Sequence, residues 1–203
     1  GGWASAPLVV PQKGKAGFNR LSSAKTGIDF KNLLDNERSI RNRNLLSGSG
    51  VAAGDVDGDG WCDLYFCGLD NGNRLYRNLG NWKFEDVTGR AGVACAGQDS
   101  TAAGFADIDG DGDLDLLVNA LGRGTRLFRN DGNFKLVEIT KECGLASTAG
   151  SMSMTLADID TDGDLDLYVA NFHPTTIKDR PNTTIRVNLV NGLPVVSFVN
   201  GVS

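Results

Sequence analysis

Short apolar segments separated by polar turns follow one another along most of this chain. Residues 51–54 are small and apolar, residues 64–67 form a continuous apolar run, and residues 74–78 and 82–88 alternate polar and apolar positions. A continuous apolar run is typical of a buried strand, and alternation is typical of a strand with one exposed face. The pattern predicts four short strands here. Helical spacing is nearly absent, and its best candidate is the irregular segment 30–46.

The same order of segments returns about 50 residues later. Asp55, Asp107 and Asp158 each open an acidic stretch after a small apolar segment, and they lie 52 and 51 residues apart. The Arg-Leu-aromatic-Arg-Asn segment at 74–78 also returns at 126–130. Four antiparallel strands per repeat of this length are typical of a β-propeller blade, and a solenoid of stacked sheets is the alternative.

The predicted fold is therefore all-β, a partial propeller of about three blades, each made of four antiparallel strands. The expected divisions are an N-terminal basic arm at 1–47, blades at 48–98 and 99–150, and an incomplete third blade at 151–203. In the third blade, Asn191-Gly192 between two apolar segments predicts an inserted hairpin with a type I′ turn. Since propellers have about four to eight blades, we expect the remaining blades in a longer chain or in other subunits.

The N-terminal arm loosely repeats the end of a blade. Residues 18–22 resemble residues 84–88, and residues 26–28 resemble the turn that follows them. This similarity predicts a possible outer strand at 18–22 that would close the ring by pairing into the last blade. The basic residues of the arm, such as Arg38, either are solvated or dock on an acidic partner.

The distribution of the acidic residues indicates a metal-binding role as well as a fold. Of the 25 acids, 21 are Asp, and 14 lie in three nine-residue stretches. In each stretch, side-chain oxygens fall at positions 1, 3, 5 and 9, position 7 can offer a backbone carbonyl, and Gly at position 6 permits a sharp turn. The predicted ligands are Asp55, Asp57, Asp59, Trp61 and Asp63; Asp107, Asp109, Asp111, Asp113 and Asp115; and Asp158, Asp160, Asp162, Asp164 and Asp166.

Oxygen ligands at this spacing suit Ca²⁺, which takes about six to eight of them, better than Mg²⁺ with its stricter octahedron. No His or thiolate is placed to bind zinc or copper. A single such stretch would also suit a solvated turn, but three copies at matched positions predict three Ca²⁺ ions, one per repeat. The net charge of −5 argues against a nucleic-acid partner, and no apolar run reaches the roughly 18 residues of a membrane span.

These motifs resemble the FG-GAP or VCBS repeat family, whose blades also form the propellers of integrin α-subunits. The resemblance covers about 46–171 and rests on the three acidic stretches and the Leu-aromatic-Arg-Asn segments. It implies calcium-binding blades of a large secreted bacterial protein that is extracellular, on the cell surface or periplasmic. Thr161 departs from the pattern at position 4, which we expect to face away from the ion.

Chemistry beyond these stretches is sparse. His173 is the only histidine, and no nucleophile motif is present, so we expect no enzyme activity. The sequence favours a calcium-stabilised extracellular module for binding or adhesion, with a protein or a glycan as its ligand. The alternative is a non-catalytic propeller within a larger extracellular enzyme, such as one that degrades polysaccharides.

Two narrower predictions concern aromatic residues and cysteines. Trp82 and Phe134 occupy equivalent repeat positions, so we expect them to pack between blades rather than to stack on sugars. Cys62 lies in an acidic stretch, at the opposite end of the blade from Cys67 and Cys95. We therefore expect Cys62 to be unpaired and any disulfide to join Cys67 to Cys95, with four free, buried thiols as the alternative.

Overall fold

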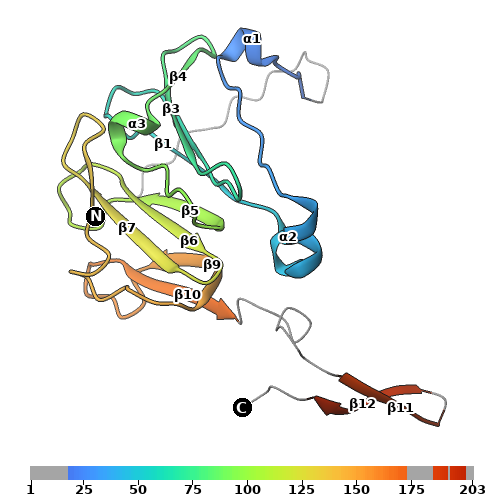
Figure 1. Cartoon of the computed structure of the whole chain (residues 1–203). Helices are drawn as coiled ribbons and strands as arrows, with labels where there is room; N and C mark the ends of the chain where they lie inside the picture. Colours follow the sequence, from blue (N-terminus) through green and yellow to red (C-terminus); the bar gives the residue numbers. More distant parts are fainter. Residues whose placement is uncertain (1–17, 173–184, 192, 200–203) are drawn as a thin grey trace, which may run out of the picture.

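The computed structural model describes residues 18–172, 185–191 and 193–199. The strands are β1 (Val51–Gly54), β2 (Asp63–Phe66), β3 (Arg74–Asn78), β4 (Phe84–Asp86), β5 (Ser100–Ala106), β6 (Asp115–Ala120), β7 (Gly124–Asn130), β8 (Leu136–Glu138), β9 (Gly150–Ala157), β10 (Asp166–Phe172), β11 (Ile185–Val190) and β12 (Leu193–Val199). The helices are α1 (Ser23–Thr26), α2 (Asn36–Arg41), the 3-10 helix η1 (Arg43–Ser47) and α3 (Thr88–Ala91). Antiparallel strands dominate the molecule (Figure 1).

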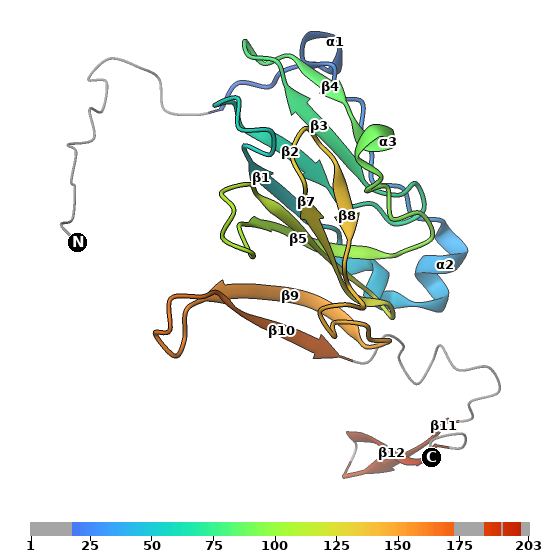
Figure 2. The same ribbon diagram turned by 90° about the vertical axis from the view of Figure 1, so that its left-hand side faces the viewer.

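Two four-stranded sheets form the first and second blades. Their strand orders are β1-β2-β3-β4 and β5-β6-β7-β8, so every strand pairs with the next one in sequence. The sheets stack on one another, with β1 against β5 and then β5 and β6 against β9 (Figure 2). The predicted all-β architecture of propeller blades, arranged as a partial propeller, is confirmed.

Close approach between the inner strands explains why their residues are small. A Cβ atom added to Gly50 would lie 2.8 Å from the Cα of Ala102, and one added to Gly54 would lie 2.8 Å from Cδ1 of Leu114. A larger side chain at Gly50 would meet the backbone of β5 and force the two blades apart, whereas one at Gly54 would displace the side chains of Leu114 and Phe105. The small residues before the acidic stretch of the first blade are therefore a requirement of its packing against the second blade.

The main core lies between the first two blades. Tyr65, Leu75 and Val93 from the first blade and Leu116 and Phe134 from the second are at most 1% exposed, and they belong to one apolar cluster. The hydroxyl of Tyr65 donates a hydrogen bond of 2.7 Å to the carbonyl of Val93, which satisfies the polar end of this buried ring. The two blades thus share one hydrophobic core.

Strands β9 and β10 represent the third blade, and β11 and β12 form a separate hairpin. Val190 lies opposite Leu193 in this hairpin. Asn191 has a φ of 54°, the left-handed conformation that a type I′ turn requires. The hairpin predicted from Asn191-Gly192 is therefore present. His173, in the connector before it, lies outside the described residues.

The N-terminal segment differs from the expectation. Residues 18–22 form no strand, and a single helical turn, α1, follows them. Gly27 ends α1 with a φ of 83°, just as Gly92 ends α3 with a φ of 72°. The weak sequence similarity therefore marks the helical turn that follows a blade and not its outer strand. The candidate helix at 30–46 is reduced to α2 and η1.

Part of the basic arm docks on acids of the same chain. Arg38 in α2 forms ion pairs with Asp70 and Asp99, the latter at 2.7 Å. Asp70 lies between β2 and β3, and Asp99 lies just before β5. This contact fixes α2 against the end of the blades opposite the acidic stretches.

All four cysteines are free thiols, so Cys62 is unpaired and no disulfide joins Cys67 to Cys95. Cys67 and Cys95 are buried, whereas Cys62 and Cys143 are exposed. The alternative of four free, buried thiols is therefore correct for the free thiols and for the burial of two of them. Burial, helped by the nearby Cys95, raises the pKa of Cys67 to about 12. Since the thiolate is the reactive form, the thiol of Cys67 is unreactive in the folded protein at neutral pH.

Candidate metal centres

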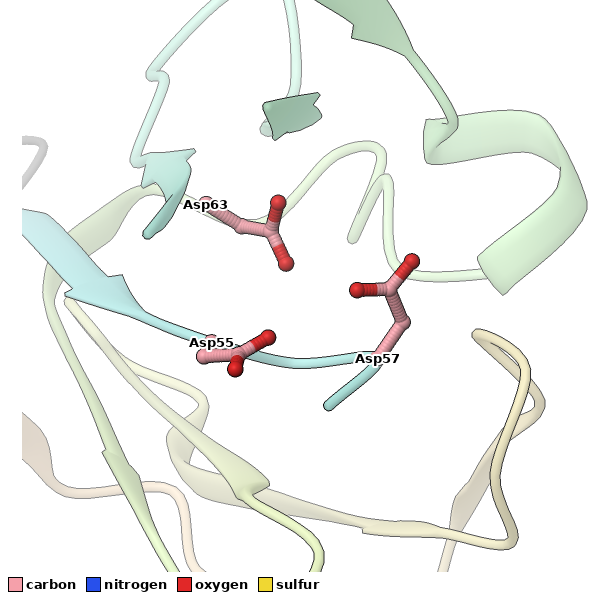
Figure 3. Close-up of side chains that lie close together, drawn as sticks. All are labelled: Asp55, Asp57 and Asp63. Atoms are coloured by element: carbon pink, nitrogen blue, oxygen red, sulfur yellow. The ribbon is translucent and has the colours of Figure 1, made fainter. Parts of the chain in front are cut away.

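Three acidic loops join the first and second strands of the three blades. We call residues 55–63 loop 1, residues 107–115 loop 2 and residues 158–166 loop 3. In each loop, carboxylate oxygens from positions 1, 3 and 9 lie within 4.8 Å of one another. The three carboxylate triads are Asp55, Asp57 and Asp63; Asp107, Asp109 and Asp115; and Asp158, Asp160 and Asp166. Figure 3 shows the side chains of the loop 1 triad converging on a common space.

The loop backbone turns sharply at positions 4 and 6. The φ angles are 71° and 87° in loop 1, 76° and 94° in loop 2, and 63° and 99° in loop 3. Glycine occupies five of these six places, because it adopts positive φ without steric cost. Thr161 is the sixth, and a β-branched residue is strained there. The spacing of the acids predicts which way position 4 faces but not the backbone conformation that this position requires.

The carboxylate at position 1 holds the loop in shape. Asp55 accepts hydrogen bonds from the backbone N–H groups of Asp59 at 3.1 Å and Gly60 at 2.8 Å. Asp107 and Asp158 each accept backbone hydrogen bonds within their own loops in the same way. The triad is thus partly organised by the protein itself.

The carboxylate at position 9 begins the second strand and is the most buried of the triad in loops 1 and 2. Asp63 accepts hydrogen bonds from the N–H groups of Val56 at 2.9 Å and Asn78 at 2.7 Å. Burial nevertheless raises the pKa of Asp63 to about 6, and burial also raises the pKa of Asp115. A buried carboxylate is costly without a nearby positive charge, so both positions favour a bound cation.

The surroundings of Asp57 show whether the residues of loop 1 suit a bound cation. Its Oδ1 atom is buried and accepts no hydrogen bond. An anionic oxygen in this situation needs a positive partner. The donors of all three triads are carboxylate oxygens, which suit hard cations such as Ca²⁺ and Mg²⁺ rather than soft-ligand metals. The triads can therefore hold a hard metal ion.

Positions 5 and 7 lie outside the triads. Position 5 is occupied by Asp59, Asp111 and Asp162, and position 7 by Trp61, Asp113 and Asp164. In every loop the carboxylate at position 5 accepts a 2.9 Å hydrogen bond from the N–H group at position 7. Position 5 thus shapes the turn, and its role as a ligand, like that of the position 7 carbonyl, stays a prediction.

Asn78 and Asn130 organise the loops from the ends of β3 and β7. Each donates its backbone N–H to the position 9 carboxylate, Asp63 or Asp115, at 2.7 Å, and its side-chain amide to the carbonyl before that residue. Asn130 also donates a 2.8 Å hydrogen bond to the carbonyl of Val56 in loop 1. In the sequence these asparagines stand out only as members of the repeated Arg-Leu-aromatic-Arg-Asn segments. The available signal was their recurrence at the same distance, 15 residues, after the last Asp of the first and second acidic stretches.

A profile of the family described as FG-GAP-like repeat matches residues 55–118 and 119–169, more than half of the chain. The chain belongs to the FG-GAP repeat family. This FG-GAP protein is also similar to cartilage acidic protein 1 of Xenopus tropicalis, with 28% identity over 129 residues. The match covers 61% of this chain and 20% of that protein, so the chain spans about a fifth of the length of this relative.

FG-GAP repeats are typical of extracellular proteins. Within the part of the chain that the structure describes, no helix is long and apolar enough to cross a membrane. The family resemblance read from the acidic stretches is confirmed. A bacterial origin stays a prediction.

Proposed function

We propose that this FG-GAP protein is a calcium-stabilised extracellular module that binds a protein or a polysaccharide and has no catalytic activity of its own. The observation that supports calcium is the carboxylate triad, repeated in three loops at equivalent places in successive blades. Each triad brings three carboxylates together, and mutual repulsion of these charges opposes folding unless a cation is bound.

Calcium suits the loops better than magnesium does. A triad supplies only part of a coordination sphere, and Ca²⁺ completes its sphere flexibly with carbonyl groups and water at about 2.3–2.6 Å. Magnesium requires a strict octahedron and gives up its own water reluctantly. Three Ca²⁺ ions would also change the net charge of the chain from −5 to +1.

Calcium would act here as a structural ion. Since the unfolded chain does not bring positions 1, 3 and 9 together, calcium binds mainly to the folded state and stabilises it by mass action. Calorimetric titration of the metal-stripped protein should show calcium binding in the micromolar to millimolar range. A flat titration, with no heat and no rise in melting temperature, would refute the assignment.

A variant of loop 2 sharpens this test. Asp109→Ala removes a triad member and should lower the melting temperature in calcium while changing it little in chelator. Asp113→Ala is the matched control, because the side chain of Asp113 lies outside the triad and the equivalent residue in loop 1 is Trp61. Equal losses in calcium and in chelator would show that the loop is held by something other than the ion.

Two acids outside the loops support the proposed absence of catalysis. Glu138 is paired with Arg126, and Asp131 is paired with Arg129 and Lys135. Charges neutralised in this way suit a structural surface rather than an acid–base pair. A glycan array and a pull-down with extracellular proteins, each run in calcium and in chelator, test the binding role. Release of reducing ends from an array glycan would overturn the non-catalytic assignment.

A further inference from the structure

Two arginines at equivalent repeat positions have different partners. Arg77 in β3 reaches into loop 1, where its Nε lies 2.7 Å from Oδ2 of Asp57 and its Nη2 donates to Oδ2 of Asp59 at 2.8 Å. Arg129, 52 residues later in β7, donates instead to Oδ1 of Asp131 at 2.9 Å. Among the described residues, no ion pair joins Arg129 to an acid of loop 2.

The residue two places further along the chain accounts for this difference. Asp131 follows Arg129, and it also pairs with Lys135 at 3.0 Å. The side chain of Arg129, with Lys135, lowers the pKa of Asp131, so its charge is available to hold the guanidinium. The equivalent residue in the first blade is Leu79, which is exposed and carries no charge. No acid at this position competes for the guanidinium of Arg77, which therefore pairs with acids of loop 1.

Arg77 is also held in place from the neighbouring blade. Its guanidinium carbon lies 5.9 Å from the centre of the Phe134 ring, close enough for a cation–π contact. One oxygen of Asp57 faces Arg77, while the other is the buried oxygen without a hydrogen bond. A cation entering loop 1 would share Asp57 with a positive charge that is already present.

We propose that Arg77 is a built-in cation of loop 1, which stabilises this loop when calcium is absent and makes its calcium affinity lower than that of loop 2. The part of this inference that concerns calcium rests on the proposed function. The part that concerns the metal-free loop rests on the ion pairs alone. The two loops would then fill at different calcium concentrations, although the carboxylate triads at positions 1, 3 and 9 match.

Trp61 makes loop 1 separately observable. It occupies position 7 of loop 1, where loops 2 and 3 have Asp113 and Asp164. Terbium(III) replaces calcium at oxygen sites, and a nearby tryptophan sensitises its luminescence. Terbium bound in loop 1 can therefore be followed through Trp61, and calcium is then added to displace it. Trp3, outside the described residues, and Trp82, which lines a surface hollow with Trp61, are replaced by Phe in every variant.

The decisive variant is Arg77→Gln, with Arg129→Gln as its matched control. At low ionic strength, removal of the positive charge beside Asp57 and Asp59 should raise the calcium affinity of loop 1 about fivefold or more. Arg129→Gln should leave that affinity unchanged. An unchanged affinity in Arg77→Gln, with calcium still binding, overturns the inference and leaves the proposed function intact.

Melting in chelator tests the metal-free loop. Arg77→Gln should lower the melting temperature in chelator and have less effect in saturating calcium, where the ion takes over its role. Equal losses in both media would show a purely structural role and would overturn the inference. Absence of terbium and calcium binding to any loop of the parent protein would instead overturn the proposed function, together with the affinity half of this inference.

An exchange of the neighbouring residues provides an independent test. Leu79→Asp supplies the acid that Asp131 provides in the second blade, so it should draw Arg77 away and raise the affinity of loop 1. Asp131→Leu should release Arg129 toward loop 2 and weaken one calcium site, as measured by calorimetry. If both exchanges leave calcium binding unchanged, the difference between Leu79 and Asp131 does not control the loops.

Discussion

The first and second blades share one repeat and yet differ in how deeply they are buried. Every residue of β6 is buried, whereas β2 alternates buried and half-buried residues. Phe134 is 1% exposed, and its equivalent in the first blade, Trp82, is 64% exposed. The second blade packs between β1 on one side and β9 on the other, whereas the first blade has a blade on one face and, within the described residues, the N-terminal segment on the other, where Phe30 stacks on Phe66. The repeat therefore determines the strands, and the neighbouring blade determines the burial.

Phe134 shows how the second blade uses its neighbour. Its ring lies 4.9 Å from the guanidinium carbon of Arg90 and 5.9 Å from that of Arg77, both in the first blade. The predicted packing between blades is thus correct for Phe134. It is wrong for Trp82 within the described residues, where this side chain lines a surface hollow with Trp61 and Asn81.

The strongest test of this comparison is to remove both aromatic rings in turn. Phe134→Ala should lower the free energy of unfolding by about 3–5 kcal/mol, because it empties a site in the shared core. Trp82→Ala should cost less than about 1 kcal/mol, since most of its surface is already in water. Urea unfolding of the two variants measures both values. Similar losses would mean that Trp82 is as well packed in solution as Phe134.

The asparagines give a second, smaller contrast. Asn130→Ala would leave the buried carbonyl of Val56 and the partly buried carbonyl of Leu114 without their amide donor, at a cost of about 1–3 kcal/mol. Asn78→Ala removes the equivalent bond to the carbonyl of Cys62 but none to another blade, so its cost should be the lower one. Denaturant unfolding checks the order of the two losses.

Amide hydrogen exchange shows which loops are destabilised by Asn130→Ala and by Asn78→Ala. If Asn130 links the second blade to loop 1, Asn130→Ala should speed amide exchange at Val56 as well as in loop 2. Asn78→Ala should speed exchange in loop 1 and leave loop 2 unchanged. Faster exchange confined to loop 2 in Asn130→Ala would break the proposed link between the blades.

Much of this fold was predictable because its signals are local. The small apolar segments, the alternating strands and Asn191-Gly192 each encode one element, and their return at a fixed spacing indicates blades. The convergence of Asp55, Asp57 and Asp63 follows from the spacing of positions 1, 3 and 9 in a tight loop. Such features need no knowledge of what lies next to them.

The remaining features depend on neighbours or on backbone geometry, which the spacing of residues does not reveal. The bond from Asn130 to Val56 spans 74 positions and exists only because two blades stack. Arg77 pairs with loop 1 and Arg129 with Asp131, an acid whose place in the first blade is taken by Leu79. Thr161 looks neutral in the sequence, yet its φ of 63° is one that β-branched residues avoid.

The smallest contrast between the blades is an ion pair at the ends opposite the loops. Arg126 in the second blade binds both oxygens of Glu138, with Nε at 2.9 Å from Oε1, whereas Nε of Arg74 in the first blade lies 3.5 Å from Asp86. Hydrogen bonding from Arg126 lowers the pKa of Glu138. The contribution of the Arg126–Glu138 ion pair to stability is therefore fully present above the ordinary pKa of a glutamate, about 4.5. It is lost as the pH falls through the lowered pKa of Glu138 in the folded protein.

We expect Glu138→Gln to flatten the acid side of the pH–stability curve. Since the side chain of Glu138 is 40% exposed, the loss at neutral pH should stay below about 1 kcal/mol. Asp86→Asn, at the equivalent and looser pair, should change the curve less. Melting temperatures of the parent and both variants between pH 3 and pH 7, in chelator, measure this difference. If the melting temperature falls with pH equally steeply in the parent and in Glu138→Gln, the Arg126–Glu138 ion pair does not stabilise the second blade more than the Arg74–Asp86 ion pair stabilises the first.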